Sequence, residues 1–476
     1  MRAATGNFRS APKNNMKKNR EINLCEGSIV KKMILYALPL LLTNVLQLLF
    51  NAADVAVLGI FVSDQAVAAV GATSALINLI VGLFVGLSVG ANVLIARFAG
   101  AGDAERAHKT VGTSVIVSVI TGVILAAVGY FGAETFLRRM DCPDNVIDMA
   151  AKYLRIYFLG MPIMMLYNYC AAILRAVGDT LRPLFYLVIG GVVNVGLNLF
   201  FVVVLKKDVE GVAIATVSSQ AISAVLSVIT ISREKGCSSL KRQYLKIYKK
   251  ELLDMMKVGI PAGLQGCVFS ISNVLIQANI NSFGDLAVSG NTVASQFDSF
   301  IYQAMYSIAL SALAFVSQNL GAGNLARVRK SVRTSLIVVT IVGIAVSGIV
   351  ILFDRELYSI ITKSDQVIDY AVLRLYYVAT PYFLCGIMDV MSNSVRGLGH
   401  STLAMIVSLF GSCVFRIIWL KTVYYLNPTL DMVYVVYPVS WALTAIIFFV
   451  LYFPLLKKTK KTLAMQGQRS DAVSDC

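Results

Sequence analysis

Charge and histidine are scarce in this 476-residue chain: charged residues make up 14% of it, and only His108 and His400 are histidines. So few histidines leave a zinc site or a His-based catalytic triad poorly supported. No GxxxxGK[ST] loop occurs, so ATP hydrolysis by this chain is also unsupported. The eight cysteines show no CxxC or Cys/His spacing. We therefore expect no enzyme, no disulfide framework, no structural metal and no cofactor.

Apolar sequence, in contrast, is abundant: 57% of the residues are hydrophobic and the mean hydropathy is +0.73. Runs such as 111–131, 184–205 and 336–353 carry almost no charge. Each reaches roughly the 20 residues that cross a bilayer. A polar, basic stretch precedes the first apolar run, so we expect no cleavable signal peptide. The composition predicts an all-α membrane protein with many spans, embedded in the lipid bilayer.

Glycine, proline and charged residues divide the apolar sequence into twelve expected transmembrane helices. In the first half these are 33–59, 66–98, 109–131, 146–173, 184–205 and 211–231. In the second half they are 255–281, 287–320, 329–353, 367–395, 402–425 and 432–456. The expected domains are a basic segment 1–32, an N-lobe 33–231, an amphipathic linker 232–254, a C-lobe 255–456 and a polar tail 457–476.

The two halves repeat each other in one register. Gly100-Ala101-Gly102 recurs as Gly321-Ala322-Gly323, and 321 − 100 = 221. Residues 175–178 (RAVG) recur as 396–399 (RGLG), and 396 − 175 = 221. A duplicated half in a hydrophobic chain is typical of transporters whose two pseudo-symmetric lobes rock about a shared cavity.

The net charge of +16 is unevenly placed. Basic residues gather in 1–32, in 233–257 and in 457–461, and the short basic connections alternate with weakly charged ones. This alternation follows the positive-inside rule and predicts an even number of spans with both termini in the cytoplasm. Nucleic acid is not expected as a partner.

Polar residues inside the apolar spans are the candidates for function, because each costs free energy in the membrane unless it is hydrogen-bonded, ion-paired or hydrated. In the first span, Gln47, Asn51 and Asp54 fall on one helix face, and Asp54 is its only acid. A single carboxylate at low dielectric can exchange a proton or hold a small cation. Alternatively, Asp54 lies near the outer end of the span and meets water or a lysine.

Asn194 and Asn198 lie on one face of the fifth span, and Thr216 lies in the sixth. Amide and hydroxyl oxygens, together with one carboxylate, suit a hard monovalent cation such as Na⁺ or a proton relay. Hydrogen bonding between helices explains the same three residues and stays open.

In the second half, Asp298, Asp389 and Arg416 fall within expected spans. We expect Arg416 to pair with Asp389 or with Asp298, because an unpaired guanidinium is costly in a membrane. A remaining free acid, with Tyr302 nearby, would attract a bulky amphipathic cation. Two arginines in matching strings are expected to anchor span ends: Arg155 and Arg374.

Several strings, in order and spacing, resemble the multidrug and toxic compound extrusion (MATE) transporters, in the branch of bacterial DNA-damage-inducible efflux proteins. They are 47–54 (QLLFNAAD), 100–103 (GAGD), 175–180 (RAVGDT), 211–216 (GVAIAT), 318–324 (QNLGAGN) and 396–399 (RGLG).

The resemblance implies two six-helix lobes that export organic compounds in exchange for H⁺ or Na⁺. It places the cation-coupling residues at Asp54, Asn194, Asn198 and Thr216. The chain departs from many relatives at Asn198, where they carry an acid, and at Phe50, where they carry tyrosine. The lost carboxylate leaves one ionisable group in this cluster.

The leading hypothesis is therefore an antiporter, a monomer in the cell membrane, that exports small cationic amphipathic compounds. Its expected substrate cavity contains Gln47, Asn51, Asp298, Tyr302, Asp389 and Arg416. The alternative, a flippase for lipid-linked oligosaccharides, would need a strongly basic cavity to bind a pyrophosphate, whereas the charges within the expected spans are mostly acidic apart from Arg416. A membrane-embedded enzyme would need clustered catalytic groups in the spans, and a scaffold or receptor would show no gradient-dependent flux.

Overall fold

The computed structural model describes residues 21–140 and 142–474, which are almost entirely helical. The first half forms α1 Ile29–Phe61, α2 Asp64–Ala101, α3 Ala104–Arg139, α4 Asp144–Leu159, α5 Met161–Ala176, α6 Leu181–Leu199, the π-helical η1 Phe200–Val204 and α7 Val209–Arg233. A short 3₁₀ turn, η2 Arg242–Tyr244, follows. The second half forms α8 Lys249–Asn281, α9 Asp285–Gly321, α10 Leu325–Leu352, α11 Asp354–Ser359, α12 Asp365–Val378, α13 Phe383–Gly397, α14 Ser401–Ser408, the π-helical η3 Leu409–Val414, α15 Phe415–Lys421, α16 Val423–Leu426 and α17 Leu430–Ser474.

Ten helical stretches of the described residues are long and apolar enough to cross a bilayer alone. Two bent pairs bring the number to the predicted twelve if each pair counts as one span. The pairs are α4 with α5, bent by 50°, and α12 with α13, bent by 48°. Pro162 is the second residue of α5 and Pro381 lies in the break before α13. Because proline lacks an N–H to donate, these two nearly equivalent positions allow the bends.

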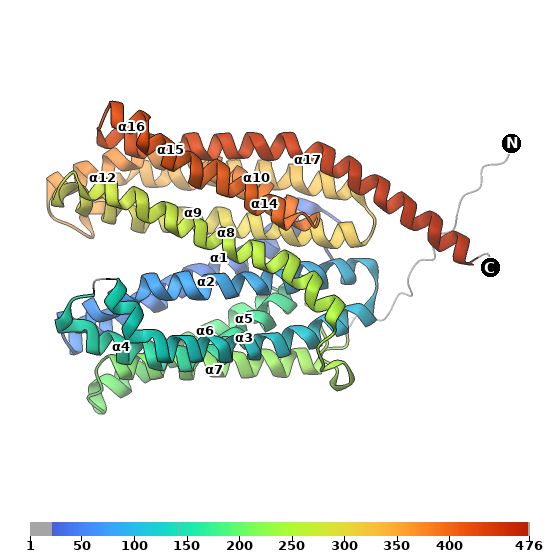
Figure 1. Ribbon diagram of the computed structural model, residues 1–476, viewed down its shortest axis with the longest axis horizontal. Helices are drawn as coiled ribbons and strands as arrows, with labels where there is room; N and C mark the ends of the chain where they lie inside the picture. The colour runs from blue at the N-terminus through green and yellow to red at the C-terminus, as the bar shows by residue number, and fades with distance from the viewer. Residues whose placement is uncertain (1–20, 141, 475–476) are drawn as a thin grey trace.

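The helices lie side by side in two groups, with α2 to α7 in one group and most of α9 to α17 in the other (Figure 1). The groups meet where α2 packs against α8. A Cβ atom on Gly86 would lie 2.3 Å from the Cα of Gly263, and one on Gly90 would lie 2.2 Å from the carbonyl oxygen of Met255. The glycine stripe of α2 thus lets two backbones touch, as small residues commonly do between membrane helices.

The duplicated motifs form matching turns. Gly102 and Gly323 adopt positive φ angles of 71° and 68°, which favour glycine. The next residues, Asp103 and Asn324, cap the following helices by accepting a hydrogen bond from the N–H three residues on, at 3.0 Å in both cases. The second motif places two more glycines at positive φ, Gly178 at 93° and Gly399 at 96°. The repeat therefore preserves the turns that set helix order.

The first pair of motifs also joins the two lobes. A Cβ atom on Gly100 would lie 1.9 Å from the carbonyl oxygen of Gln318, and one on Gly321 would lie 1.9 Å from that of Arg97. The contact is reciprocal, each glycine meeting the backbone of the other half. It closes the lobes against each other at the end that carries the basic connections.

Residues 21–28, which precede α1, strengthen this closed end. The Ile22 N–H donates to the Gly178 carbonyl oxygen at 3.4 Å, in the first half. The carbonyl oxygen of the fully buried Leu24 accepts from Arg327 Nε at 3.1 Å and from Asn319 Nδ2 at 3.2 Å, both in the second half. The segment thus bridges the two lobes.

The connection between the lobes is shorter than expected. α7 ends at Arg233 and α8 begins at Lys249, so 249–254 form the first turns of α8. Glu251 in these turns is buried and accepts from Arg106 Nε at 3.3 Å. This contact with α3 explains why a charged stretch continues the helix. The connection and the end of α17 lie at the same end of the bundle (Figure 1).

Candidate functional site

Asp54 on α1 lies at the centre of a polar cluster built from three helices. Its Oδ1 accepts from Asn198 Nδ2 at 2.5 Å, and its Oδ2 accepts from the Thr216 hydroxyl at 3.1 Å. Asn194 donates to Thr216 Oγ1 at 3.4 Å and accepts from Asn198 at 3.3 Å. The four residues expected to couple a cation therefore lie together, and Asp54 is only 8% exposed.

Helix geometry explains the convergence. The four-residue spacing of Asn194 and Asn198 puts both amides on one face of α6. α6 then passes into the π-helical η1, Phe200–Val204, directly beyond Asn198. In the second half, the π-helical η3, Leu409–Val414, likewise precedes Arg416. Wider π turns often lie at functional sites, and nothing in our reading of the sequence predicted them.

The space beside Asp54 fits a single ion. The cavity has a volume of about 20 Å³, and roughly 10–15 Å³ on this measure holds one water. Among the described residues, none of those that line it is cationic, and Asn198 Oδ1 has no hydrogen-bond partner. Carboxylate, amide and hydroxyl oxygens suit a proton or a hard monovalent cation. No cluster of His, Cys, Asp and Glu in the described chain could hold a transition metal.

Gln47 and Asn51, expected in the substrate cavity, line this small cavity instead. They follow the same face of α1 as Asp54, and Gln47 Nε2 donates to Asn51 Oδ1 at 3.3 Å. The residues expected in one substrate cavity therefore belong to two separate spaces.

The larger space lies among helices of the second half and has a volume of about 550 Å³. Ligand pockets commonly measure 300–1,000 Å³, so a small organic molecule fits here. Asp298, Tyr302, Asp389 and Arg416, the other expected cavity residues, all line it. α1 contributes Leu48, so the cavity borders the first lobe.

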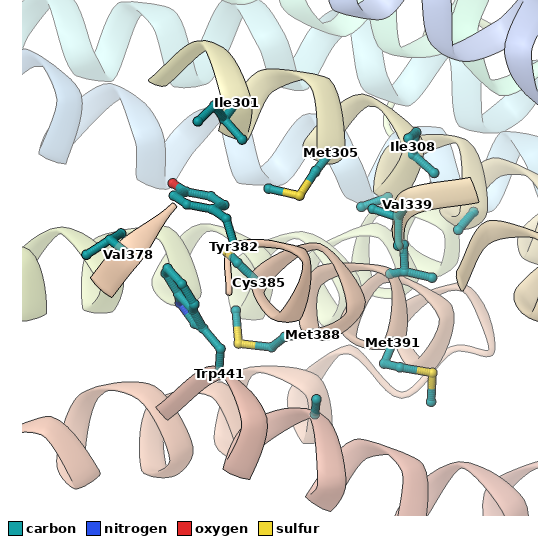
Figure 2. Close-up of a cluster of buried hydrophobic side chains, with 14 of the residues drawn as sticks. Ile301, Met305, Ile308, Val339, Val378, Tyr382, Cys385, Met388, Met391 and Trp441 are labelled. Carbon is teal, nitrogen blue, oxygen red and sulfur yellow. The ribbon is translucent and has the colours of Figure 1, made fainter. Parts of the chain in front are cut away.

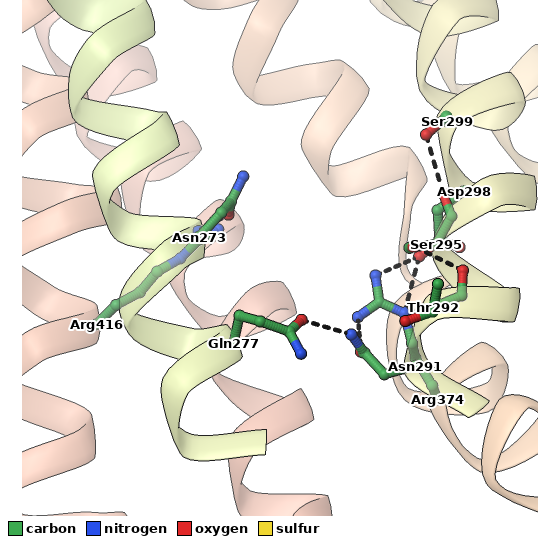
Figure 3. A network of polar contacts seen from close by, with 9 residues as sticks. All are labelled: Asn273, Gln277, Asn291, Thr292, Ser295, Asp298, Ser299, Arg374 and Arg416. Carbon is green, nitrogen blue, oxygen red and sulfur yellow. Dashed lines mark hydrogen bonds and ion pairs between the residues drawn. The ribbon is translucent and has the colours of Figure 1, made fainter. Parts of the chain in front are cut away.

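The pairing of charges in this cavity corrects two predictions, the first of them about Asp298. Arg374 donates to Asp298 Oδ2 through Nη2 at 2.6 Å and Nε at 3.1 Å, and to Asn291 Oδ1 at 2.7 Å (Figure 3). Gln277 accepts from Asn291 at 2.8 Å and extends the network. Arg374 is therefore a buried partner of Asp298 and not a span-end anchor. Arg155, by contrast, is partly exposed, and its Nη2 lies 3.5 Å from Glu134 Oε2.

The second correction concerns Arg416, which makes no ion pair within the described residues. Its Nε donates to Ser440 Oγ at 3.0 Å, and its Nη1 lies 3.3 Å from Asn273 Oδ1 and 3.4 Å from Ser272 Oγ. Figure 3 shows it beside Asn273 and apart from the Asp298–Arg374 pair. The prediction failed because Arg374 already neutralises Asp298, a contact that the spacing in the sequence does not reveal.

Aromatic and sulfur-containing side chains form the apolar wall of the cavity. The Tyr382 and Trp441 rings lie 5.0 Å apart beside Cys385 and Met388 (Figure 2). Met305, in contrast, is fully buried in the core. Sequence reasoning missed Tyr382, Trp441 and Asn291 as lining residues. Asn291 could have been found, because it lies seven residues, or two helical turns, before Asp298 on α9.

Twelve spans in two lobes, with an ion-sized polar site in one and a ligand-sized cavity in the other, define a membrane transporter and not an enzyme. The MatE family model matches residues 39–200 and 261–420, and the chain belongs to that family.

Individual relatives agree with this family. The probable multidrug resistance protein YoeA of Bacillus subtilis is 26% identical, covering 92% of this chain and 96% of that protein. The probable multidrug resistance protein NorM of Thermotoga maritima is 28% identical over 80% of this chain and 82% of its own. A solved structure of a multidrug resistance MATE family transporter in an outward-facing conformation has a TM-score of 0.86 at 22% identity, covering 94% of this chain and 100% of that chain. The fold is therefore shared along nearly the whole chain.

Proposed function

We propose that this protein is a secondary antiporter that exports small organic compounds in exchange for H⁺ or Na⁺ by alternating access. The observation that carries the proposal is the separation of two sites: an ion-sized site at Asp54 in one lobe, and a 550 Å³ cavity in the other. The printed names of the relatives, which are multidrug resistance proteins, support export of such compounds.

Coupling follows from the reciprocity of linked binding. A cation at Asp54, Asn194, Asn198 and Thr216 favours one arrangement of the lobes, and the exported compound favours the other. In the closed arrangement seen here, the Gly100 and Gly321 contacts hold the basic end shut. We propose that this end, with both termini, faces the cytoplasm, as the positive-inside rule predicts. We also propose that the protein is a monomer in the cell membrane.

The cavity is suited to an amphipathic substrate that carries a positive charge. Asp389 lines the cavity, forms no ion pair within the described chain, and has an Oδ2 atom with no hydrogen-bond partner. The Tyr382 and Trp441 rings offer aromatic surface in the same cavity. Acid and aromatic surface together favour an organic cation.

The decisive experiment measures export of a fluorescent organic cation from proteoliposomes. Sodium is varied at fixed pH, and then pH at fixed sodium, to identify the coupling ion. Asp54→Asn should lower gradient-driven export by at least about 100-fold, because it removes the only carboxylate of the ion site. Asp208→Asn, an exposed change in the same lobe, is the control. If Asp54→Asn transports as well as the unaltered protein at equal expression, the coupling role is wrong.

A further inference from the structure

A groove on the surface of the C-lobe lies between α10 and α17 and has a volume of about 390 Å³. Both helices pack on α13, which contributes Met391 to the lining, and within the described residues they scarcely touch each other. Phe453, which also lines the groove, is 61% exposed. The groove is therefore open to the lipid around the spans, and it shares no lining residue with the ion site or the 550 Å³ cavity.

Four cationic side chains gather at one end of this groove. Arg329 and Arg333 come from α10, and Lys457 and Lys460 come from α17. Their spacings of four and three put each pair on one helix face. α10 begins just after the turn at Gly323, and α17 leads toward the same closed end of the bundle (Figure 1). Both pairs therefore lie at the end that carries the basic connections.

The rest of the groove is apolar. On α10, Leu336 follows Arg333 by three residues, and on α17, Phe449 and Phe453 precede the lysines on the same face. From Phe449 to Lys460 there are 460 − 449 = 11 residues, or about 16 Å of helix at a rise of about 1.5 Å per residue. This length is about half of the roughly 30 Å hydrocarbon core, which is the depth of one leaflet.

No acidic side chain balances the four cations. Among the described residues none lines the groove, and none forms an ion pair with any of the four. At the same end of the bundle, in contrast, Arg106 pairs with Glu251 at 3.3 Å and Arg182 pairs with Glu234. Tyr452 also lines the groove, and its buried hydroxyl has no described hydrogen-bond partner. Because buried polar groups are normally hydrogen-bonded, the groove lacks both a counter-charge and an acceptor.

We propose that the groove binds an anionic phospholipid. Its phosphate lies among the four cations and supplies the acceptor, and one acyl chain lies along the apolar part. Basic pockets between membrane helices on the cytoplasmic side bind anionic headgroups in this way. Residues 1–20 do not suit the groove, because they carry six cations and no acid. The lipid site goes beyond the proposed antiport and does not depend on it.

Native mass spectrometry of the full-length protein, released from detergent micelles, tests the proposal by counting single bound lipids. The probes are phosphatidylglycerol and phosphatidylcholine with identical acyl chains, at equal concentration. We expect the unaltered protein to prefer phosphatidylglycerol by at least about 25-fold. Lys457→Gln/Lys460→Gln should lower this preference by about 5- to 25-fold, because each cation near an anionic headgroup contributes a factor of about five. Arg329→Gln/Arg333→Gln should act in the same way.

Matched controls separate the groove from general surface charge. Lys458→Gln/Lys461→Gln removes the same charge from the same turns of α17, but neither residue lines the groove, so the preference should remain. Leu336→Trp fills the apolar part and should weaken binding of both lipids by about tenfold, the effect of about 1.4 kcal/mol. Ile337→Trp places the same ring on the neighbouring exposed position, outside the groove, and should have little effect.

Three results would overturn the proposal. The first is equal binding of both lipids by the unaltered protein, and the second is an equal loss of preference in the groove and control lysine variants. The third is a lipid-free dimer that the groove variants dissociate, because a second copy of the chain would then cover the groove. Lipid binding is measured without an ion gradient, so a failure of antiport in proteoliposomes leaves the lipid site intact, and the loss of the lipid site leaves antiport intact.

Discussion

The two lobes share their turns but not their polar interiors. Matching glycines and helix caps recur 221 residues apart with nearly the same φ angles. In contrast, the N-lobe holds one carboxylate among neutral oxygens in about 20 Å³, and the C-lobe holds two acids and two arginines in about 550 Å³. The two halves therefore share the turns and helix caps that define the fold, but they differ in the polar residues of their interiors.

The residues at the equivalent positions show how this divergence arose. At the offset of 221, Asn194 corresponds to Phe415, Asn198 to Trp419 and Thr216 to Tyr437. Trp419 donates its Nε1–H to the Met432 carbonyl oxygen at 2.9 Å and packs in the C-lobe, and Tyr437 lines the large cavity. Polar side chains in one lobe thus correspond to aromatic side chains in the other. The equivalent positions therefore cannot form the same kind of site in both lobes.

The largest expected contrast between the lobes lies in what their acids contribute to stability. Arg374→Met leaves the buried carboxylate of Asp298 without its counter-charge, so we expect a loss of about 3–5 kcal/mol in the free energy of unfolding. Asp54→Asn should change it by less than about 1 kcal/mol, because Asp54 has no cationic partner to strand. Reversible unfolding in mixed detergent micelles measures both.

The double variant Asp298→Asn/Arg374→Met supplies the control for this contrast. It removes both charges, so most of the lost stability should return. If the double variant is as unstable as Arg374→Met alone, the loss comes from packing, and the assignment of a structural ion pair to the C-lobe fails.

A smaller effect is expected at the contact between the lobes. Gly86→Val places a side chain where a Cβ atom alone would lie 2.3 Å from the backbone of Gly263. Overpacking of this kind costs about 1–3 kcal/mol. Gly82→Val, one turn earlier on α2, meets nothing within 4 Å and should cost little. Thermal unfolding of the two proteins distinguishes them, and equal melting temperatures would contradict the role of the α2–α8 contact.

The site residues that could be predicted from the sequence are polar residues inside apolar spans, where burial in the membrane costs free energy whatever their neighbours are. Asp54, Asn194, Asn198 and Thr216 each interrupt an apolar span, so each could be identified without knowledge of its neighbours. Helix number and the approximate span limits were predictable for the same reason, since they follow from hydropathy along the chain.

The pairing of residues, in contrast, depends on packing between helices and was not predictable. Arg374 on α12 and Asp298 on α9 are 76 positions apart in the sequence and meet only because these two helices pack together. Asp298 and Asp389 both lie in apolar spans, so hydropathy gives no reason to prefer one of them as the partner of Arg416. The π-helical segments before Arg416 and after Asn198 could not be predicted from composition, because they consist mainly of the apolar residues that an ordinary membrane helix also contains.

The smallest of these effects tests a single contact in the N-lobe site. The Thr216 hydroxyl donates to Asp54 Oδ2 at 3.1 Å and accepts from Asn194 at 3.4 Å. Thr216→Val keeps the shape but removes one oxygen ligand, so the concentration of the coupling ion needed for half-maximal export should rise by about tenfold or less. Thr216→Ser restores the hydroxyl and should restore the affinity. Binding of the fluorescent organic cation in the C-lobe should be unaltered in both variants, because Thr216 does not line that cavity. A loss of dye binding in Thr216→Val would show that the two lobes do not divide ion and substrate between them.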